Sequence, residues 1–267
     1  MGNRFRQPEG WREADWDATA RGENPMSAIR TSEGLVSAEP SAFSQELVDA
    51  FFVRGRTLFQ TNLAPLLSGR GGVGLVLEYG CGAGRIMKSV IESGHPCSGV
   101  DISPTMLQRC RELVPEAGPL YLVDEDGHFA APSAQAVLVY SYSVLQHFAS
   151  LSRFVVALDE MCRVLATGGD LAIQVYCEDF TAGPDQPSRT ENHEGWSLHY
   201  RPARPRPYKR HDQDPWRGIY IGFSELGRLL AERGVSIERW YYHNPRKPRS
   251  IWVIGRKACP VQTTPSD

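Results

Sequence analysis

The stretch VLEYGCGAGRI, residues 76–86, decides how the chain folds, because it joins a strand pattern to three closely spaced glycines. Mostly apolar residues lead into the turn, and Gly80, Gly82 and Gly84 follow within five positions. A glycine-rich turn between a buried strand and a helix lets the backbone approach a nucleotide-like cofactor closely. We therefore expect a cofactor at this turn and a helix from Gly84 to about Ser93.

Strand patterns alternate with helical patterns beyond this turn. Strands are expected at residues 72–79, 96–102, 118–123, 134–141 and 168–176. Helices are expected at residues 103–114, opened by Pro104, and at residues 151–166. This alternation is typical of a parallel sheet with helices on both faces and right-handed crossovers.

The alternation stops near Cys177. Residues 180–218 are rich in Pro, Arg, His and Trp with little periodicity, which indicates either a functional loop or a disordered segment. Ser224 is then expected to cap a helix that ends at Gly234. Two strand patterns, VSIERWYY and SIWVIGR, follow with a short link between them. Such a link favours an antiparallel hairpin.

The composition is that of an ordinary globular protein, with 267 residues, 41% hydrophobic and 10% aromatic. No apolar run approaches the roughly 18 residues of a membrane-spanning helix. The first residues lack the apolar segment of a secretory signal, so a cytoplasmic location is expected. The six cysteines show no CxxC spacing, which favours neither a disulfide framework nor a zinc site.

Charge is unevenly distributed along the chain. The net charge is −2, yet residues 189–256 hold 14 Lys and Arg against 7 Asp and Glu. This basic part can attract an anionic substrate. The alternative is a plain solvated surface, since the chain uses 25 Arg and only 4 Lys throughout. No dense basic run with interleaved aromatics occurs, so nucleic acid is not expected as a partner.

The glycine spacing indicates which cofactor binds. A nicotinamide or flavin fingerprint is GxGxxG, and Arg85 stands at its third glycine position. A GxGxG turn preceded by the acid Glu78 leaves room for a zwitterionic tail beside the backbone. The turn by itself is only moderately specific.

Two acidic positions add to this pattern. Asp101 ends the next strand, 17 residues after Gly84, where a carboxylate can accept both hydrogen bonds of a ribose diol. A helix-capping role is the alternative for Asp101. In the later turn VDEDG, Asp126, with Asp124 as second choice, can accept from an adenine amino group. A plain surface turn is the alternative there.

In this order and spacing, five stretches resemble the class I S-adenosylmethionine-dependent methyltransferases: VLEYGCGAGR, GVDISPTML, VDEDG, VYSYSVLQHF and MCRVLATGGDLAIQVY. The resemblance covers about residues 72–177 and the terminal helix and hairpin to residue 256. It implies an α/β, Rossmann-like fold with a seven-stranded, mostly parallel sheet whose last strand is antiparallel. It also implies S-adenosylmethionine as cofactor and S-adenosylhomocysteine as product.

The same resemblance assigns cofactor contacts to the glycine turn and to the ends of three strands. The assigned residues are Glu78, Gly80, Cys81, Gly82, Gly84, Asp101, Ile102, Asp126, Gly127, Tyr140 and Ser141. The turn glycines should approach the methionyl part of the cofactor, with Glu78 near its ammonium group or a structural water. Asp101 should contact the ribose, and the pair Asp126 and Gly127 should lie near adenine. Tyr140 and Ser141 should line the methionyl side.

Methyl transfer from a sulfonium is an in-line displacement, in which the enzyme mainly positions the nucleophile and excludes water. His147 lies just past the fourth expected strand and is the best candidate base, because imidazole titrates near neutral pH. Its neighbour Gln146 is a candidate for orienting substrate or cofactor. A capping or packing role is the alternative for both, and His128 is a weaker candidate base.

We expect three parts of the chain. Residues 1–70, with helical patterns at Trp11–Arg21 and 41–67, should form a helical lid. Residues 71–257 should form the cofactor-binding domain, with an acceptor-side insertion at about 178–222, and residues 258–267 a tail. The histidines of the insertion match no metal-ligand spacing, so no metal is expected.

These observations predict a methyltransferase acting on O or N of a small molecule, with bacterial secondary metabolism and antibiotic biosynthesis as the expected setting. A homodimer is one option for its assembly. One alternative is a methyltransferase that uses the basic C-terminal part to bind a peptide, a protein or a nucleic acid. Others are a nicotinamide-dependent oxidoreductase and a non-catalytic relative that keeps the cofactor as a structural ligand.

Overall fold

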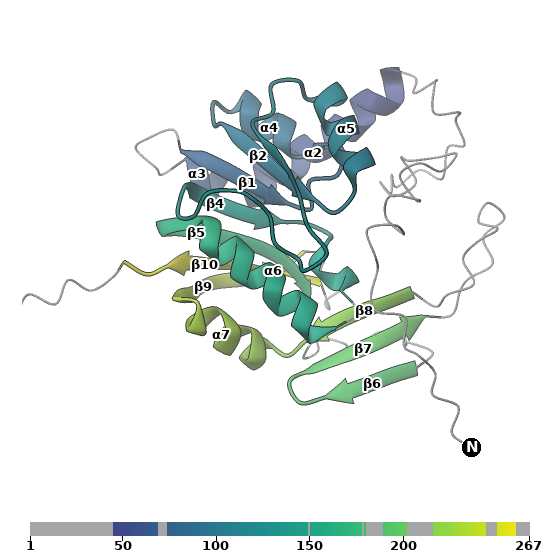
Figure 1. Cartoon of the computed structure of the whole chain (residues 1–267), viewed down its shortest axis with the longest axis vertical. Helices are drawn as coiled ribbons and strands as arrows, with labels where there is room; N and C mark the ends of the chain where they lie inside the picture. The colour runs from purple at the N-terminus through teal and green to yellow at the C-terminus, as the bar shows by residue number, and fades with distance from the viewer. Residues whose placement is uncertain are drawn as a thin grey trace, which may run out of the picture.

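The computed structural model describes residues 45–68, 74–148, 150–177, 179, 189–201, 216–243 and 250–259. In these ranges the chain forms a large sheet covered by helices and a smaller sheet at one end (Figure 1). The helix expected at Trp11–Arg21 lies outside the described residues. Within the described ranges, no helix has both the length and the apolar character needed to cross a membrane.

The large sheet has seven strands in the order β3-β2-β1-β4-β5-β10-β9. Their bounds are β1 Leu75–Tyr79, β2 Cys97–Asp101, β3 Leu120–Leu122, β4 Ala136–Ser141, β5 Leu165–Tyr176, β9 Val235–Tyr242 and β10 Ser250–Lys257. The first five strands pair in parallel, and β10 is antiparallel to both of its neighbours. The predicted fold class is therefore confirmed. The strand order reverses between β1 and β4, where open α/β sheets bind their ligands.

Helices cover both faces of this sheet. They are α2 Gln45–Asn62, α3 Ala64–Leu67, α4 Met87–Glu92, α5 Pro104–Leu113, α6 Leu151–Val164, α7 Phe223–Glu232 and the short 3-10 helix η2 Leu145–His147. Helices α2 to α5 pack on one face, and α6 and α7 pack on the other. This split follows from strand geometry, since successive residues point to opposite faces. In β1, Val76 joins one cluster and Leu77 the other.

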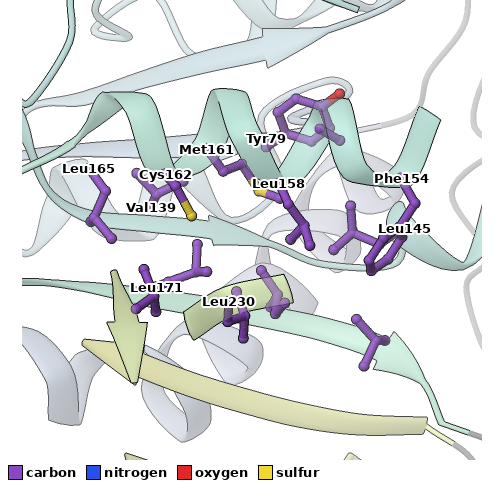
Figure 2. Packing of buried hydrophobic residues seen from close by; sticks show 14 of the residues in the cluster. Tyr79, Val139, Leu145, Phe154, Leu158, Met161, Cys162, Leu165, Leu171 and Leu230 are labelled. Carbon is purple, nitrogen blue, oxygen red and sulfur yellow. The ribbon is translucent and has the colours of Figure 1, made fainter. Parts of the chain in front are cut away.

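The core beside α6 is built from side chains that recur at helical spacing. Leu158, Met161 and Cys162 project from α6 onto Val139 and Leu171 of the sheet (Figure 2). Full burial of one such leucine contributes about 1.5–3 kcal/mol. The apolar face predicted for this helix is therefore what attaches it to β4 and β5.

Two predicted helix starts have different outcomes. Pro104 opens α5 as expected, and the Ser103 hydroxyl accepts from the Met106 amide at 3.2 Å. The prediction that Ser224 caps α7 is wrong, because Gly222 is the N-cap and Ser224 lies inside the helix. The first amide of α7 instead donates to the Asp179 carboxylate at 2.7 Å. This partner is 44 positions away, beyond the reach of a local capping rule.

The smaller sheet replaces part of the expected irregular loop. Strands β6 Arg189–His193, β7 Trp196–Arg201 and β8 Trp216–Ile221 pair antiparallel in that order. The prediction of a segment without regular structure at residues 180–218 is therefore wrong for these strands. The signal was the two-residue turn Glu194–Gly195, in which Gly195 has a φ of 76°. Such turns join hairpin strands whatever the composition around them.

Candidate functional site

The glycine turn after β1 is tied to the end of β2. The amides of Gly80 and Cys81 both donate to the Val100 carbonyl, at 2.7 and 2.9 Å. The Gly82 amide donates to the Asp101 carboxylate at 2.8 Å. Two features that the sequence placed 19 positions apart therefore form one unit at the carboxyl edge of the sheet.

The three turn glycines meet different surroundings, although all have positive φ. A Cβ at Gly84 would lie 2.8 Å from both the Cys110 sulfur and a Val114 methyl group, so this glycine lets α5 approach. A Cβ at Gly80 would lie 2.2 Å from a methyl group of Val144. A Cβ at Gly82 would meet nothing within 4 Å. The backbone at Gly82 therefore borders open space, as a cradle for a ligand requires.

Asp101 is a half-buried carboxylate at this edge. It also accepts from the Ser103 amide at 2.9 Å, and Ser103, not Asp101, caps α5 with its side chain. Burial raises the pKa of Asp101, while hydrogen bonds from backbone amides oppose this rise. A carboxylate has about four lone-pair sites, so further donors can still bind. Ile102 follows directly and packs against the α6-side core.

Both aspartates of the acidic turn after β3 are exposed, and one of them organises the loop. The Asp124 carboxylate accepts from the amides of Asp126 and His128, at 3.0 and 2.8 Å. Asp126 itself is exposed, and Gly127 turns the chain with a φ of 98°. An adenine contact for Asp126 therefore stays a prediction, with Asp124 shaping the backbone beneath it.

Helix α6 anchors this loop through residues that the sequence reasoning missed. Arg163 donates to the carbonyls of Phe129 and Ala131, at 2.9 and 2.6 Å, and pairs with buried Glu160 at 2.7 Å. Burial alone would raise the pKa of Glu160, but hydrogen bonds from Arg163, His128 and the Phe129 amide lower it. The spacing of Glu160 and Arg163, three apart on a helix, was the available signal.

Glu78 lies beneath the glycine turn with only 4% of its surface exposed. The Tyr140 hydroxyl donates to it at 2.8 Å. Burial raises the pKa of Glu78 to about 8, and this outweighs the hydrogen bond from Tyr140 and the attraction of Arg85. Because burial removes the carboxyl group from solvent, its neutral form is favoured near pH 7.

Other predicted cofactor contacts are also buried. The side chains of Tyr140 and Ser141 are fully inaccessible, and the Ser141 hydroxyl donates to the Tyr79 carbonyl at 2.9 Å. Cys81 is 4% exposed, and its sulfur lies 2.7 Å from where a Cβ on Gly99 would be. These three residues can therefore offer a ligand little more than their main-chain atoms.

The segment after β4 carries the two candidate catalytic residues. Ser143 has a φ of 61°, a strained conformation for a residue with a side chain. The Gln146 amide group bonds the Ser143 hydroxyl at 3.0 Å and lies 3.3 Å from the His147 ring. Burial lowers the pKa of His147 to about 4, although a hydrogen bond with the Ser143 backbone opposes this. The structure thus brings Gln146 and His147 together, and burial favours the neutral form of the imidazole.

Known proteins share a domain and a fold with this chain. Residues 77–173 match the family described as "Methyltransferase domain". A trans-aconitate 2-methyltransferase of Enterobacter sp. (strain 638) is 26% identical over 189 residues, 67% of this chain. The match spans 65% of that relative's length.

Solved structures share the fold. The methyltransferase CcbJ of Streptomyces caelestis gives a TM-score of 0.55 at 15% identity, covering 77% of this chain and 90% of its own. S-adenosylmethionine-bound CalS10, an amino pentose methyltransferase of Micromonospora echinaspora, also gives 0.55, at 12% identity, covering 78% and 92%. Residues 77–173 therefore match a methyltransferase domain, as the resemblance implied, and the chain shares its fold with an S-adenosylmethionine-bound methyltransferase. The cofactor of this class of domain is S-adenosylmethionine.

The open space at Gly82 generates a first prediction. Gly82→Ala should weaken S-adenosylhomocysteine binding at least tenfold, because the added methyl group projects toward the expected ligand. Gly94→Ala is the matched control, since Gly94 also has positive φ and nothing near its Cβ position. Both variants should lose about 1–2 kcal/mol of stability. Isothermal titration calorimetry measures the affinities, and equal binding by the two variants would contradict the placement of the ligand.

Glu78 generates a second prediction, on pH. Its folded-state pKa of about 8 exceeds the ordinary value of 4.5, so the folded protein binds the extra proton between these limits. Wild-type stability should therefore fall relative to Glu78→Gln as pH rises from 5.5 to 8, by at most about 1.4 kcal/mol per unit. Urea unfolding at several pH values measures this. Glu112→Gln, at an exposed carboxylate on α5, is the control, and parallel curves for wild type and Glu78→Gln would refute the prediction.

Proposed function

We propose that the chain transfers a methyl group from S-adenosylmethionine to an oxygen or nitrogen of a small molecule. The observation that carries this proposal is the glycine turn held to Asp101 beside the point where the strand order reverses. The open backbone at Gly82 fits an extended cofactor tail, and the Asp101 carboxylate fits a ribose diol. When bound, the cofactor supplies a methyl group made electrophilic by the positive sulfur.

The chain's own residues would divide the binding between them. Gly80 and Gly82 would face the methionyl part, and Asp101 with Ile102 would hold the ribose. Asp126 and Gly127 would lie at the adenine. Tyr140 and Ser141 would contribute main-chain atoms only, since their side chains are buried.

The low pKa of His147 supports methyl acceptors that react without general-base catalysis. A group whose conjugate acid has a pKa of about 4 is a weak proton acceptor at neutral pH. We infer that His147 and Gln146 position the acceptor-side segment, and that the acceptor arrives already nucleophilic. A carboxylate oxygen or a neutral amine meets this requirement. The name of the relative, a trans-aconitate methyltransferase, supports a small carboxylic acid, as does the basic C-terminal quarter.

The imidazole of His147 should stay neutral across the physiological range. We expect its ring resonances, assigned by comparison with His147→Gln, to show no protonation between pH 8 and 5.5. Heteronuclear NMR of histidine-labelled protein measures this without an acceptor. Protonation with a midpoint between pH 6 and 7 would contradict the positioning role and restore His147 as a general base.

The methyl transfer itself is tested with methyl-labelled S-adenosylmethionine and an extract of the native organism. We expect label in a low-molecular-weight product, found by mass analysis. Asp101→Asn should lower S-adenosylhomocysteine affinity about 10- to 100-fold, because the charged acceptor of two hydrogen bonds is lost. Label in protein or nucleic acid alone would overturn the small-molecule proposal.

The remaining alternatives give different results. A nucleic-acid substrate would show binding that weakens steeply with salt, whereas turnover of a small compound would change little. Tight binding of a nicotinamide dinucleotide instead of S-adenosylhomocysteine would support the oxidoreductase. Cofactor binding with no labelled product would support the non-catalytic relative. The three-part organisation of the chain, a cytoplasmic location and a homodimer stay predictions.

A further inference from the structure

Arg85, the residue directly after the last turn glycine, lies between two aromatic rings. Its guanidinium carbon is 5.7 Å from the centroid of the Phe51 ring and 5.8 Å from that of Tyr142. Phe51 comes from α2, and Tyr142 follows β4 at the carboxyl edge of the sheet. Rings at this distance hold a planar cation in place while leaving its N–H groups able to donate.

Helix α2 fixes the backbone of Arg85 as well as its side chain. A Cβ at Gly55 would lie 1.8 Å from the Arg85 carbonyl oxygen, so only glycine allows this contact. Phe51 precedes Gly55 by one helical turn and therefore lies on the same side of α2. Helix α2 therefore contacts both the backbone of Arg85, through Gly55, and its guanidinium group, through Phe51.

The cation has donors but no acid paired with them. In the part of the chain that the structure describes, no carboxylate lies within 4.0 Å of Arg85 and no side-chain hydrogen bond engages it. By contrast, Arg163, Arg228, Arg233 and Arg256 each have a carboxylate partner. Burial lowers the pKa of Arg85, and the attraction of Tyr142 and Glu78 opposes this. A half-buried guanidinium of this kind gains most from an anion that binds its fork.

A second cation lies nearby. Arg54, beside Gly55 on α2, is within electrostatic reach of both Arg85 and Tyr142. Both guanidinium groups carry a positive charge at neutral pH. The positive potential at this end of the glycine turn therefore favours a negatively charged ligand group.

The charges around the turn serve different parts of the expected cofactor. Asp101, bonded to the Gly82 amide, lies where the ribose is expected, and Arg85 adds a positive charge three residues after Gly82. Buried Glu78 lies close enough to interact with both charges. If the proposed function is correct, the zwitterionic tail therefore extends toward Arg85. We propose that Arg85 binds the α-carboxylate of the cofactor's amino-acid tail and makes cofactor affinity depend on that tail.

Two nucleosides separate this role from a structural one. S-adenosylhomocysteine carries the amino-acid tail, whereas 5′-methylthioadenosine has the same adenosine and thioether without it. Arg85→Met, whose side chain still fits between the rings, should weaken S-adenosylhomocysteine binding about 10- to 100-fold by calorimetry. Its affinity for 5′-methylthioadenosine should stay within about twofold of wild type. Arg85→Lys keeps the charge but loses the pair of parallel N–H donors. Its affinity for S-adenosylhomocysteine should lie between those of wild type and Arg85→Met.

Arg56→Met is the matched control, because Arg56 is an exposed arginine on the same helix, 3.6 Å from Glu92. It should leave both affinities unchanged. Equal losses for the two nucleosides in Arg85→Met would overturn the inference, since a structural defect does not distinguish them. Unchanged S-adenosylhomocysteine binding would overturn it too. Failure of the wild type to bind either nucleoside would instead count against the proposed function on which the inference rests.

Discussion

The hydrogen bond from the Gly82 amide to the Asp101 carboxylate is the contact on which the candidate site depends. Parallel pairing brings β1 beside β2, with Tyr79 opposite Val100, so the next residues of both strands emerge at one edge. Pairing alone leaves the turn free to bend either way. The Val100 carbonyl, which accepts from the amides of Gly80 and Cys81, and the Asp101 carboxylate fix the conformation of the turn. The orientation of the Gly82 backbone is therefore fixed before a ligand binds. Such preorganisation reduces the entropy lost on binding.

Polar groups beneath this turn carry a cost that an apolar core would avoid. Glu78 is buried against Tyr140, and burial shifts the pKa values of Glu78 and Arg85 away from their charged forms. Buried ionisable groups are rarely retained for stability alone, because removing their water is expensive. Their place at the carboxyl edge, next to the glycine turn, is consistent with a binding role. Perturbed pKa values of this kind cluster at functional sites.

The segment after β4 is held by long-range contacts. The Ser143 amide donates to the Gln174 side chain at 2.8 Å, and Gln174 donates in turn to Ser250 at 2.6 Å. This links the strained segment after β4 to β5 and β10. The strain at Ser143 is thereby held in place by neighbours from two other strands. Neither Gln174 nor Ser250 carried a signal in the sequence, because each looks like an ordinary strand residue.

The sequence by itself determined the order of strands and helices, the glycine turn, the Ser103–Pro104 helix start and the position of Asp101, because side-chain period and turn chemistry encode these locally. It misjudged the β6–β8 sheet and the cap of α7, where pairing and a distant carboxylate override composition. Only the tertiary structure decided that Asp124 organises its loop, that burial lowers the pKa of His147 and that Arg85 lies beside two aromatic rings. These properties arise from burial and from partners distant in the chain, and no local pattern records either.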